Sequence, residues 1–177
     1  MSIIDNLFGT YDMYLLKFFN QPFSVSLNIF FIILIYSIYP ILILLAFFFM
    51  RTKQFEKLSR LFLVVVFGYL FVLGIKYYVD RPRPYENHPE LAKIFEKVDP
   101  SFPSAHTFLS FLVLYFIPKQ LPKWTKYTFI LYLTVLIPIG VLYAGVHYPS
   151  DVLFGAIIGL LFPKIVSENL AKKIFKF

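Results

Sequence analysis

The sequence predicts an all-α integral membrane protein, a helix bundle of five transmembrane spans preceded by an N-terminal amphipathic surface helix. Hydrophobic residues make up 59% of its 177 residues and charged residues only 15%, whereas a soluble domain carries about a quarter charged residues. The apolar residues also come in long runs, which are typical of membrane spans. Because no internal repeat divides the chain, we interpret residues 1–177 as one membrane-embedded domain.

Residues 1–20 predict the surface helix. They lack the basic segment and the uninterrupted apolar core of a signal peptide. Between residues 3 and 19, apolar side chains fall on one helical face and polar side chains lie off it. The apolar face comprises Ile3, Ile4, Leu7, Phe8, Tyr11, Leu15, Phe18 and Phe19. This pattern is expected of a helix that lies on the membrane surface, and equally of a helix packed against the bundle.

Five apolar segments predict the spans. They are Val25–Met50 with a bend at Pro40, Leu61–Val79, Ser104–Ile117, Trp124–Val146 and Asp151–Val166. The third and the fifth are short: at ~1.5 Å per residue the third is about 21 Å long, against a hydrocarbon core of about 30 Å. Between the second and third spans, residues 80–102 contain four prolines and predict a loop.

The charges between these segments predict the orientation. With five spans, residues 51–60, residues 118–126 and the C-terminal tail share one side, which holds eleven of the 17 basic residues and two acidic ones. The positive-inside rule places that side in the cytoplasm and the 80–102 loop outside it. Since topology explains the basic residues, the net charge of +7 does not indicate a nucleic-acid partner.

Polar segments on the outer side carry the candidate chemistry. Lys76 and Arg83 stand at the end of the second span. A lone lysine there is explained by its ammonium reaching the membrane interface. The nearby arginines, with His and Ser side chains on the same side, indicate an anion site instead, because the planar fork of arginine suits a phosphate.

Two further segments add a helix start and a His-Asp pair. Ser104 predicts a helix N-cap, and a helix N-terminus also binds anions. His106, in the first turn, could donate a proton. Asp151 lies four residues after His147, so it could fix the imidazole tautomer and leave the other nitrogen free to attack. Capping of the fifth span by Ser150 or Asp151 is an equally good explanation.

Metal and cofactor sites are not predicted. The chain has no cysteine, which excludes disulfides and Cys-based metal sites. Its three histidines stand in dissimilar contexts without metal-ligand spacing.

With these residues in place, the sequence resembles the type 2 phosphatidic acid phosphatase (PAP2) superfamily of membrane lipid phosphatases over about residues 60–165. The first family motif is Lys, six residues and Arg-Pro, and Lys76 with Arg83 and Pro84 matches it. The second is Pro-Ser-Gly-His, which Ser104 and His106 match with Ala105 in the glycine position. The surface helix resembles the short bacterial members.

The third motif matches in part. It is Ser-Arg, five residues, His, three residues and Asp; His147 and Asp151 match, but Val141 replaces the arginine. A charge-assisted hydrogen bond of that kind is worth about 1.5–3 kcal/mol. We expect Arg81 to compensate, because residues two apart in an extended stretch point the same way and Arg81 would then face the phosphate beside Arg83. The alternative is a non-catalytic lipid-phosphate-binding membrane protein.

The resemblance implies hydrolysis of a phosphomonoester or pyrophosphate on a lipid head group through a phosphohistidine, without a metal. His147 would attack, Asp151 would orient it and His106 would protonate the leaving oxygen. The phosphoryl oxygens would be held by Lys76, Arg83, Ser104, Ala105 through its backbone, and Arg81. The partners would be the lipid phosphate substrate and membrane lipids.

The resemblance also implies a place and a substrate class. Bacterial relatives act on undecaprenyl pyrophosphate, phosphatidylglycerol phosphate or the 1-phosphate of lipid A, and the sequence predicts neither the choice among them nor an oligomeric state. The expected location is the bacterial inner (cytoplasmic) membrane, multi-pass, with the active site facing the periplasm or cell exterior. Vanadate-dependent haloperoxidases share these motifs but are soluble, and the five predicted spans argue against them.

Overall fold

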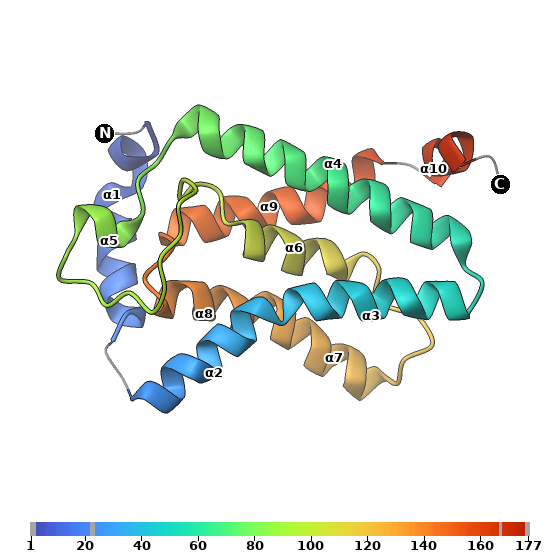
Figure 1. Ribbon diagram of the computed structural model, residues 1–177, viewed down its shortest axis with the longest axis horizontal. Helices are drawn as coiled ribbons and strands as arrows, with labels where there is room; N and C mark the ends of the chain where they lie inside the picture. The colour runs from blue at the N-terminus through green and yellow to red at the C-terminus, as the bar shows by residue number, and fades with distance from the viewer. Residues whose placement is uncertain (1–2, 22–23, 167, 176–177) are drawn as a thin grey trace.

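The computed structural model describes residues 3–21, 24–166 and 168–175, and its regular elements in those residues are all helical (Figure 1). The helices are α1 (Ile3–Phe19), α2 (Val25–Tyr36), α3 (Ile38–Arg51), α4 (Phe55–Val79), α5 (Pro84–Asn87), α6 (Ala105–Leu114), α7 (Lys123–Leu131), α8 (Ile137–Tyr143), α9 (Pro149–Ile165) and α10 (Glu168–Phe175). A π-helical turn, η1 (Tyr132–Leu136), joins α7 to α8. The predicted all-α class is confirmed.

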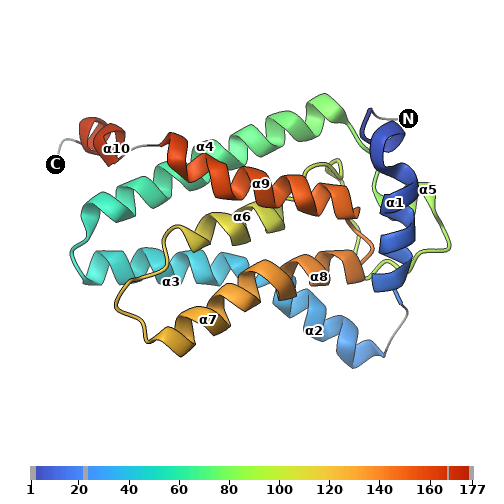
Figure 2. The same cartoon turned by 180° about the vertical axis from the view of Figure 1, so that it is seen from behind.

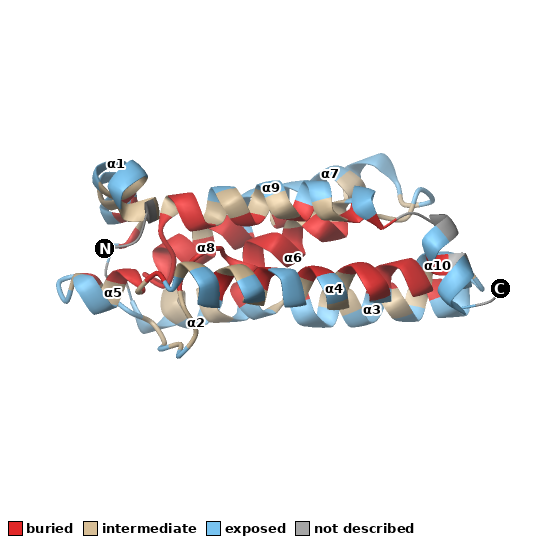
Figure 3. Ribbon diagram, turned by 90° about the horizontal axis from the view of Figure 1, so that it is seen from above, coloured by how far each residue is buried: buried red, intermediate tan, exposed pale blue. Residues whose placement is uncertain are grey.

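The helices from α2 to α4 and from α6 to α9 run along the bundle, and α1 and the single turn α5 lie together at one of its ends (Figures 1 and 2). Viewed from above, α6 lies between a layer formed by α7 and α9 and a layer formed by α3 and α4, and the buried residues face this interior (Figure 3). Most of α6 is buried, from Ala105 to Val113. A helix that is apolar on most of its circumference is stable only when neighbours surround it.

Three helical segments are long and apolar enough to cross a membrane: Val25–Arg51, Phe55–Asn87 and Lys123–Tyr143. The helices at the third and fifth predicted spans are shorter, with ten residues in α6 and seventeen in α9. Each of the five predicted spans therefore corresponds to helix, but the count of five crossings remains a prediction. Large apolar side chains on the outer surface, such as Ile43, Leu44 and Phe67, are more than half exposed, as suits contact with lipid.

Several boundaries differ from the prediction. The first span is interrupted at Ser37 rather than at Pro40. Proline has no N–H to give to the carbonyl four residues earlier, so the regular helix restarts just before it and Pro40 falls in the first turn of α3. The fourth helical segment ends at Tyr143 rather than Val146, the 80–102 loop contains the single turn α5, and α10 was not predicted.

Two glycines of α9 let it approach α6 very closely. A Cβ atom on Gly155 would lie 2.5 Å from the Ser104 carbonyl oxygen, and one on Gly159 would lie 2.4 Å from the Phe108 carbonyl oxygen. Any side chain at these positions would collide with the backbone of α6. The Ser104 amide also donates a 3.0 Å hydrogen bond to the Asp151 carbonyl. The N-terminal ends of α6 and α9 are thus locked together.

Candidate active site

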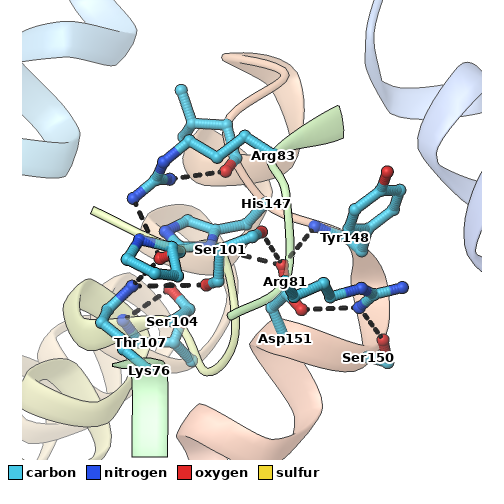
Figure 4. Close-up of polar contacts among 12 residues, drawn as sticks. Lys76, Arg81, Arg83, Ser101, Ser104, Thr107, His147, Tyr148, Ser150 and Asp151 are labelled. Atoms are coloured by element: carbon cyan, nitrogen blue, oxygen red, sulfur yellow. Dashed lines mark hydrogen bonds and ion pairs between the residues drawn. The ribbon is translucent and has the colours of Figure 1, made fainter. Parts of the chain in front are cut away.

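The three polar segments that are distant in the sequence meet at the end of the bundle near α1 and α5 (Figures 1 and 4). The side chains that converge there are each at most 1% exposed: Lys76, Arg81, Arg83, Ser104, His106, His147 and Asp151. Charged groups are buried only when they are paired or when they bind something charged. The partners of each group therefore indicate which of them are available to a ligand.

Lys76 and Arg83 share the carboxylate of Asp99, a residue that the sequence did not single out. The Lys76 ammonium lies 3.0 Å from Oδ2 of Asp99, and Nη2 of Arg83 lies 2.9 Å from Oδ1. Burial alone would raise the pKa of Asp99, but the charges of Lys76 and Arg83 outweigh it and lower that pKa to about 2. Lys76 and Arg83 thus bind the ionised carboxylate of Asp99 between them.

Backbone carbonyls fix the direction of both cations. Arg83 donates from Nη1 to the Val146 carbonyl at 2.7 Å and from Nε to the Asp99 carbonyl at 2.9 Å. Lys76 donates to the carbonyl of Pro100. Because these contacts use backbone carbonyls rather than the Asp99 carboxylate, the cations remain positioned when another anion replaces that carboxylate.

Ser104 caps α6, as predicted. Its hydroxyl accepts from the Thr107 amide at 3.4 Å and from the Thr107 hydroxyl at 3.1 Å, and its own amide is bound to the Asp151 carbonyl. Ala105 begins the helix, where backbone N–H groups lack intrahelical acceptors. The amides of Ala105 and His106, rather than those of Ser104 and Thr107, have no acceptor among the described residues and can bind an anion.

His106 is buried without a hydrogen-bond partner in the described part of the chain, at either ring nitrogen. Its ring lies edge-on to two tyrosines, with centroid distances of 5.5 Å to Tyr36 and 5.8 Å to Tyr39. Buried polar atoms are almost always hydrogen-bonded. The unpaired imidazole therefore indicates a place where a polar ligand or water binds.

His147 and Asp151 lie next to each other as expected, but Nδ1 of His147 makes no hydrogen bond among the described residues. Nδ1 of His147 lies 3.5 Å from Oδ2 of Asp151, and that oxygen also accepts from the Ser101 hydroxyl and, at 2.8 Å, from the Tyr148 amide. Burial, followed by the charges of Arg83, Lys76 and Lys97, holds the pKa of His147 well below its usual range. Both effects favour the neutral imidazole, the form in which a ring nitrogen can attack.

Arg81 lies on the other side of Asp151 (Figure 4). It makes four hydrogen bonds: Nε to Asp5 at 2.8 Å, Nη2 to Asp12 at 2.8 Å, and Nη1 to Asp151 at 2.7 Å and Ser150 at 2.8 Å. All three of its nitrogens are therefore engaged.

This arrangement disagrees with the expectation that Arg81 faces the phosphate beside Arg83. Three carboxylates already surround the Arg81 guanidinium. Two like charges about 4 Å apart repel by about 4 kcal/mol at an effective dielectric constant near 20, so a phosphate here would be repelled by each carboxylate. The alternation of side chains failed as a guide because Asp5 and Asp12 of α1, far away in the sequence, attract Arg81 to the opposite side.

Val141, at the position of the family arginine, is completely buried in an apolar cluster with Ile35, Ala144 and Val146. Apolar packing rather than another charge therefore fills this position. Sequence reasoning also missed Ser101 and Asp99; their only signal is that they stand just before the Pro-Ser segment of the second motif.

The site can therefore bind an anion between Lys76 and Arg83. The imidazole of His147, with the Asp151 carboxylate next to it, lies close to that position. The PAP2 superfamily profile matches residues 57–174. Bacitracin transport permease protein BcrC of Bacillus licheniformis is 31% identical over 118 residues, and phosphatidylglycerophosphatase B of Bacillus subtilis is 31% identical over 128 residues.

These alignments cover 63% and 66% of this chain, and they span 55% and 60% of the length of the two relatives. Among solved structures, Aquifex aeolicus LpxE superposes with a TM-score of 0.76 at 28% identity, covering 88% of this chain and 94% of LpxE. The transmembrane PAP2-type phosphatidylglycerolphosphate phosphatase of Bacillus subtilis superposes with a TM-score of 0.73 at 26% identity, covering 97% and 90%. The chain belongs to the PAP2 superfamily.

Proposed function

We propose that the protein is a membrane lipid phosphatase that transfers a phosphoryl group from a lipid head group to His147 and then to water. The observation that carries the proposal is the carboxylate of Asp99 held between Lys76 and Arg83, 3.0 Å and 2.9 Å away. A phosphate offers the same kind of oxygen ligand with more charge, and it would displace Asp99 on binding. The names of the phosphatase relatives support the same reaction.

In the first step, a lone pair of the free His147 nitrogen forms the N–P bond while the bond from phosphorus to the lipid oxygen breaks. The leaving oxygen takes a proton from the imidazolium of His106, which becomes neutral in this step and whose buried nitrogens have no partner among the described residues. Asp151 stabilises the charge that develops on the His147 ring. In the second step, water gives a proton back to His106 and its oxygen displaces His147 from phosphorus, releasing inorganic phosphate.

Fixed cations take the role of charge stabilisation in this proposal. Lys76, Arg83 and the first-turn amides of α6 hold the equatorial oxygens, where charge develops during phosphoryl transfer. Among the described residues, no group of three or more His, Asp or Glu side chains is placed to hold a metal ion. We accordingly propose that turnover needs no divalent metal.

We further propose that the site faces outward from the bacterial cytoplasmic membrane and that α1 lies at that surface. At ~1.5 Å per residue, α6 is about 15 Å long and α9 about 25 Å, both shorter than the hydrocarbon core of about 30 Å. The site at their N-terminal ends would thus lie slightly below the surface, level with a lipid phosphate. Undecaprenyl pyrophosphate, phosphatidylglycerol phosphate and lipid A 1-phosphate remain the candidate substrates.

The direct test is phosphate release by the purified protein in detergent from these three lipids, with and without a chelator. We expect release from at least one lipid, insensitivity to the chelator, and inhibition by vanadate. His147→Asn should abolish release, and acid quenching of the wild-type reaction should trap phosphate on a histidine. Loss of activity on chelation, restored by a metal, would contradict the metal-free mechanism.

A second candidate function is a lipid-phosphate binder without catalysis. It is favoured by Val141, which is buried among apolar residues at the position where the third family motif has an arginine. In that case the wild-type protein would bind lipid phosphates or vanadate but release no phosphate from any lipid tested.

A further inference from the structure

The loop between α5 and α6 covers the position where the family arginine is missing. Ile94 and Phe95 pack against the apolar cluster that contains Val141. The Ile94 amide donates a 3.3 Å hydrogen bond to the Ala144 carbonyl. The Tyr85 hydroxyl is within 3.0 Å of both the amide and the carbonyl of Lys97, so this loop segment is attached at both ends. The backbone of Lys97 is therefore held by Tyr85, a residue that itself packs against the cluster containing Val141.

The side chain of Lys97 shares an aromatic neighbour, Tyr36, with His106. Its ammonium lies 5.7 Å from the centroid of the Tyr36 ring and 5.9 Å from that of Phe95. The same Tyr36 ring lies 5.5 Å from the His106 ring. Tyr36 thus contacts both the ammonium of Lys97 and the imidazole that lacks a partner.

Lys97 also differs from the other cations of the site in its pairing. Lys76 and Arg83 share Asp99, whereas the described residues include no carboxylate within 4.0 Å of the Lys97 ammonium. Contact with aromatic faces holds a cation weakly compared with a charged hydrogen bond. An incoming phosphate can therefore draw the ammonium away from the rings without breaking an ion pair.

We propose that Lys97 is the third phosphate-binding cation of the site and takes the place of the arginine that Val141 replaces. The proposal rests on the proposed function, since the ligand is the phosphoryl group of that reaction. A flexible lysine stem reaches the phosphate from the loop, whereas the family arginine would reach it from α8. As a point charge, lysine neutralises an equatorial oxygen but does not make the bidentate contact of arginine.

The electrostatics of the site agree with this placement. The charge of Lys97 is one of those that, after burial, lower the pKa of His147. Burial likewise lowers the pKa of Lys97 itself, an effect that Asp99 opposes and Arg83 reinforces. The charge of Lys97 therefore acts on the same imidazole as the charges of Arg83 and Lys76.

The test compares Lys97→Gln with Lys93→Gln in the full-length protein. Lys93 is a matched control, because it lies four residues earlier in the same loop but is half exposed and paired with Glu96. We expect Lys97→Gln to lower kcat/KM by roughly 10²–10³-fold, the loss typical of one preorganised contact to the transition state. Vanadate affinity should fall at least tenfold. Lys97→Arg should retain most activity, and Lys93→Gln should match the wild type.

A pH profile separates this role from a merely structural one. Without the Lys97 charge the pKa of His147 rises, so the acid limb of kcat/KM should move to higher pH in Lys97→Gln and stay in place in Lys93→Gln. Elution as a single species and an unchanged helical circular dichroism spectrum establish that the variants are folded. Lys97→Met provides a second neutral variant with an apolar stem.

Vanadate binding measured by calorimetry distinguishes the failure of this proposal from that of the phosphatase proposal. If the wild type binds vanadate but releases no phosphate, the phosphatase fails, and loss of binding in Lys97→Gln still supports the cation. If the wild type is active and Lys97→Gln equals Lys93→Gln in turnover, vanadate affinity and acid limb, the Lys97 proposal alone is overturned. No vanadate binding by the wild type would overturn both.

Discussion

Nη1 of Arg81 donates a 2.7 Å hydrogen bond to Oδ1 of Asp151, while Oδ2 of the same carboxylate faces His147 at 3.5 Å. The carboxylate thus links a buried guanidinium to the candidate nucleophile. The other nitrogens of Arg81 are bound by Asp5 and Asp12 of α1. Helix α1 therefore helps to determine the position of Asp151, although it contributes no residue to the phosphate site.

The first prediction follows from this link. Arg81→Gln should destabilise the protein, because removing one partner of a buried ion pair leaves uncompensated charge at a typical cost of about 3–5 kcal/mol. Turnover should fall together with stability. Vanadate affinity of the folded fraction should change little, because Arg81 faces away from the phosphate site. Thermal unfolding in detergent and vanadate calorimetry measure the two effects.

Arg83→Gln is the control for that experiment. It should weaken vanadate binding, because Arg83 shares its anion with Lys76. Should Arg81→Gln instead lose vanadate affinity at an unchanged unfolding temperature, Arg81 would be a phosphate ligand, as its place in the sequence suggests.

The second prediction concerns Asp99, the carboxylate between the two cations. Asp99→Asn removes the competing charge from the place where a phosphate binds, so vanadate affinity should rise by about tenfold, the scale of one charge-assisted contact. The KM for the lipid substrate should fall for the same reason. Glu96→Gln, a neutralised carboxylate in the same loop, should leave both values unchanged. Equal or weaker vanadate binding by Asp99→Asn would mean that Asp99 supports the site rather than competes for it.

The pKa of Asp99 adds a dependence of stability on pH. It lies at about 2 in the folded protein, below the ordinary value of 3.8. A lowered pKa means that the ionised form favours folding, so this contribution is complete above pH 4 and is lost as the pH falls toward 2. The unfolding temperature of the wild type should therefore drop more steeply over this range than that of Asp99→Asn. Parallel curves for the two proteins would exclude this contribution.

The helices and the meeting of the three motifs could be predicted from the sequence because apolar runs, prolines and charge asymmetry are local signals. The position of Arg81 could not, because it depends on the docking of α1, which places Asp5 and Asp12 next to residues about 70 positions later. The role of Asp99 was hidden for a related reason. A carboxylate in a Pro-rich loop resembles any solvated residue until the loop folds over Lys76 and Arg83.

The third prediction concerns topology. The chain has no cysteine, so a single cysteine reports on one position without background. Val98, in the loop beside the site, is fully exposed, and Val98→Cys should react with a membrane-impermeant thiol reagent in intact cells. Lys119→Cys, in the basic loop between α6 and α7, should react only after lysis. The reverse pattern would place the site in the cytoplasm and contradict the orientation predicted from the basic residues.

The last prediction tests the contact between α6 and α9 that aligns the site. A Cβ atom on Gly155 would lie 2.5 Å from the Ser104 carbonyl oxygen, and backbone cannot move aside as a flexible side chain can. Gly155→Ala should therefore push the two helix N-termini apart, moving the first turn of α6 relative to Asp151. Overpacking of this kind typically costs about 1–3 kcal/mol of stability, and a displacement of about 1 Å at a reacting centre can lower the rate about 10²-fold.

Gly74→Ala is the matched control, because nothing lies within 4 Å of a Cβ atom at that position. Alanine also has a higher helix propensity than glycine. We expect Gly155→Ala to lower both turnover and the unfolding temperature. Gly74→Ala should keep wild-type turnover and raise the unfolding temperature slightly. Wild-type turnover by Gly155→Ala would show that the site does not depend on the close approach of these two helices.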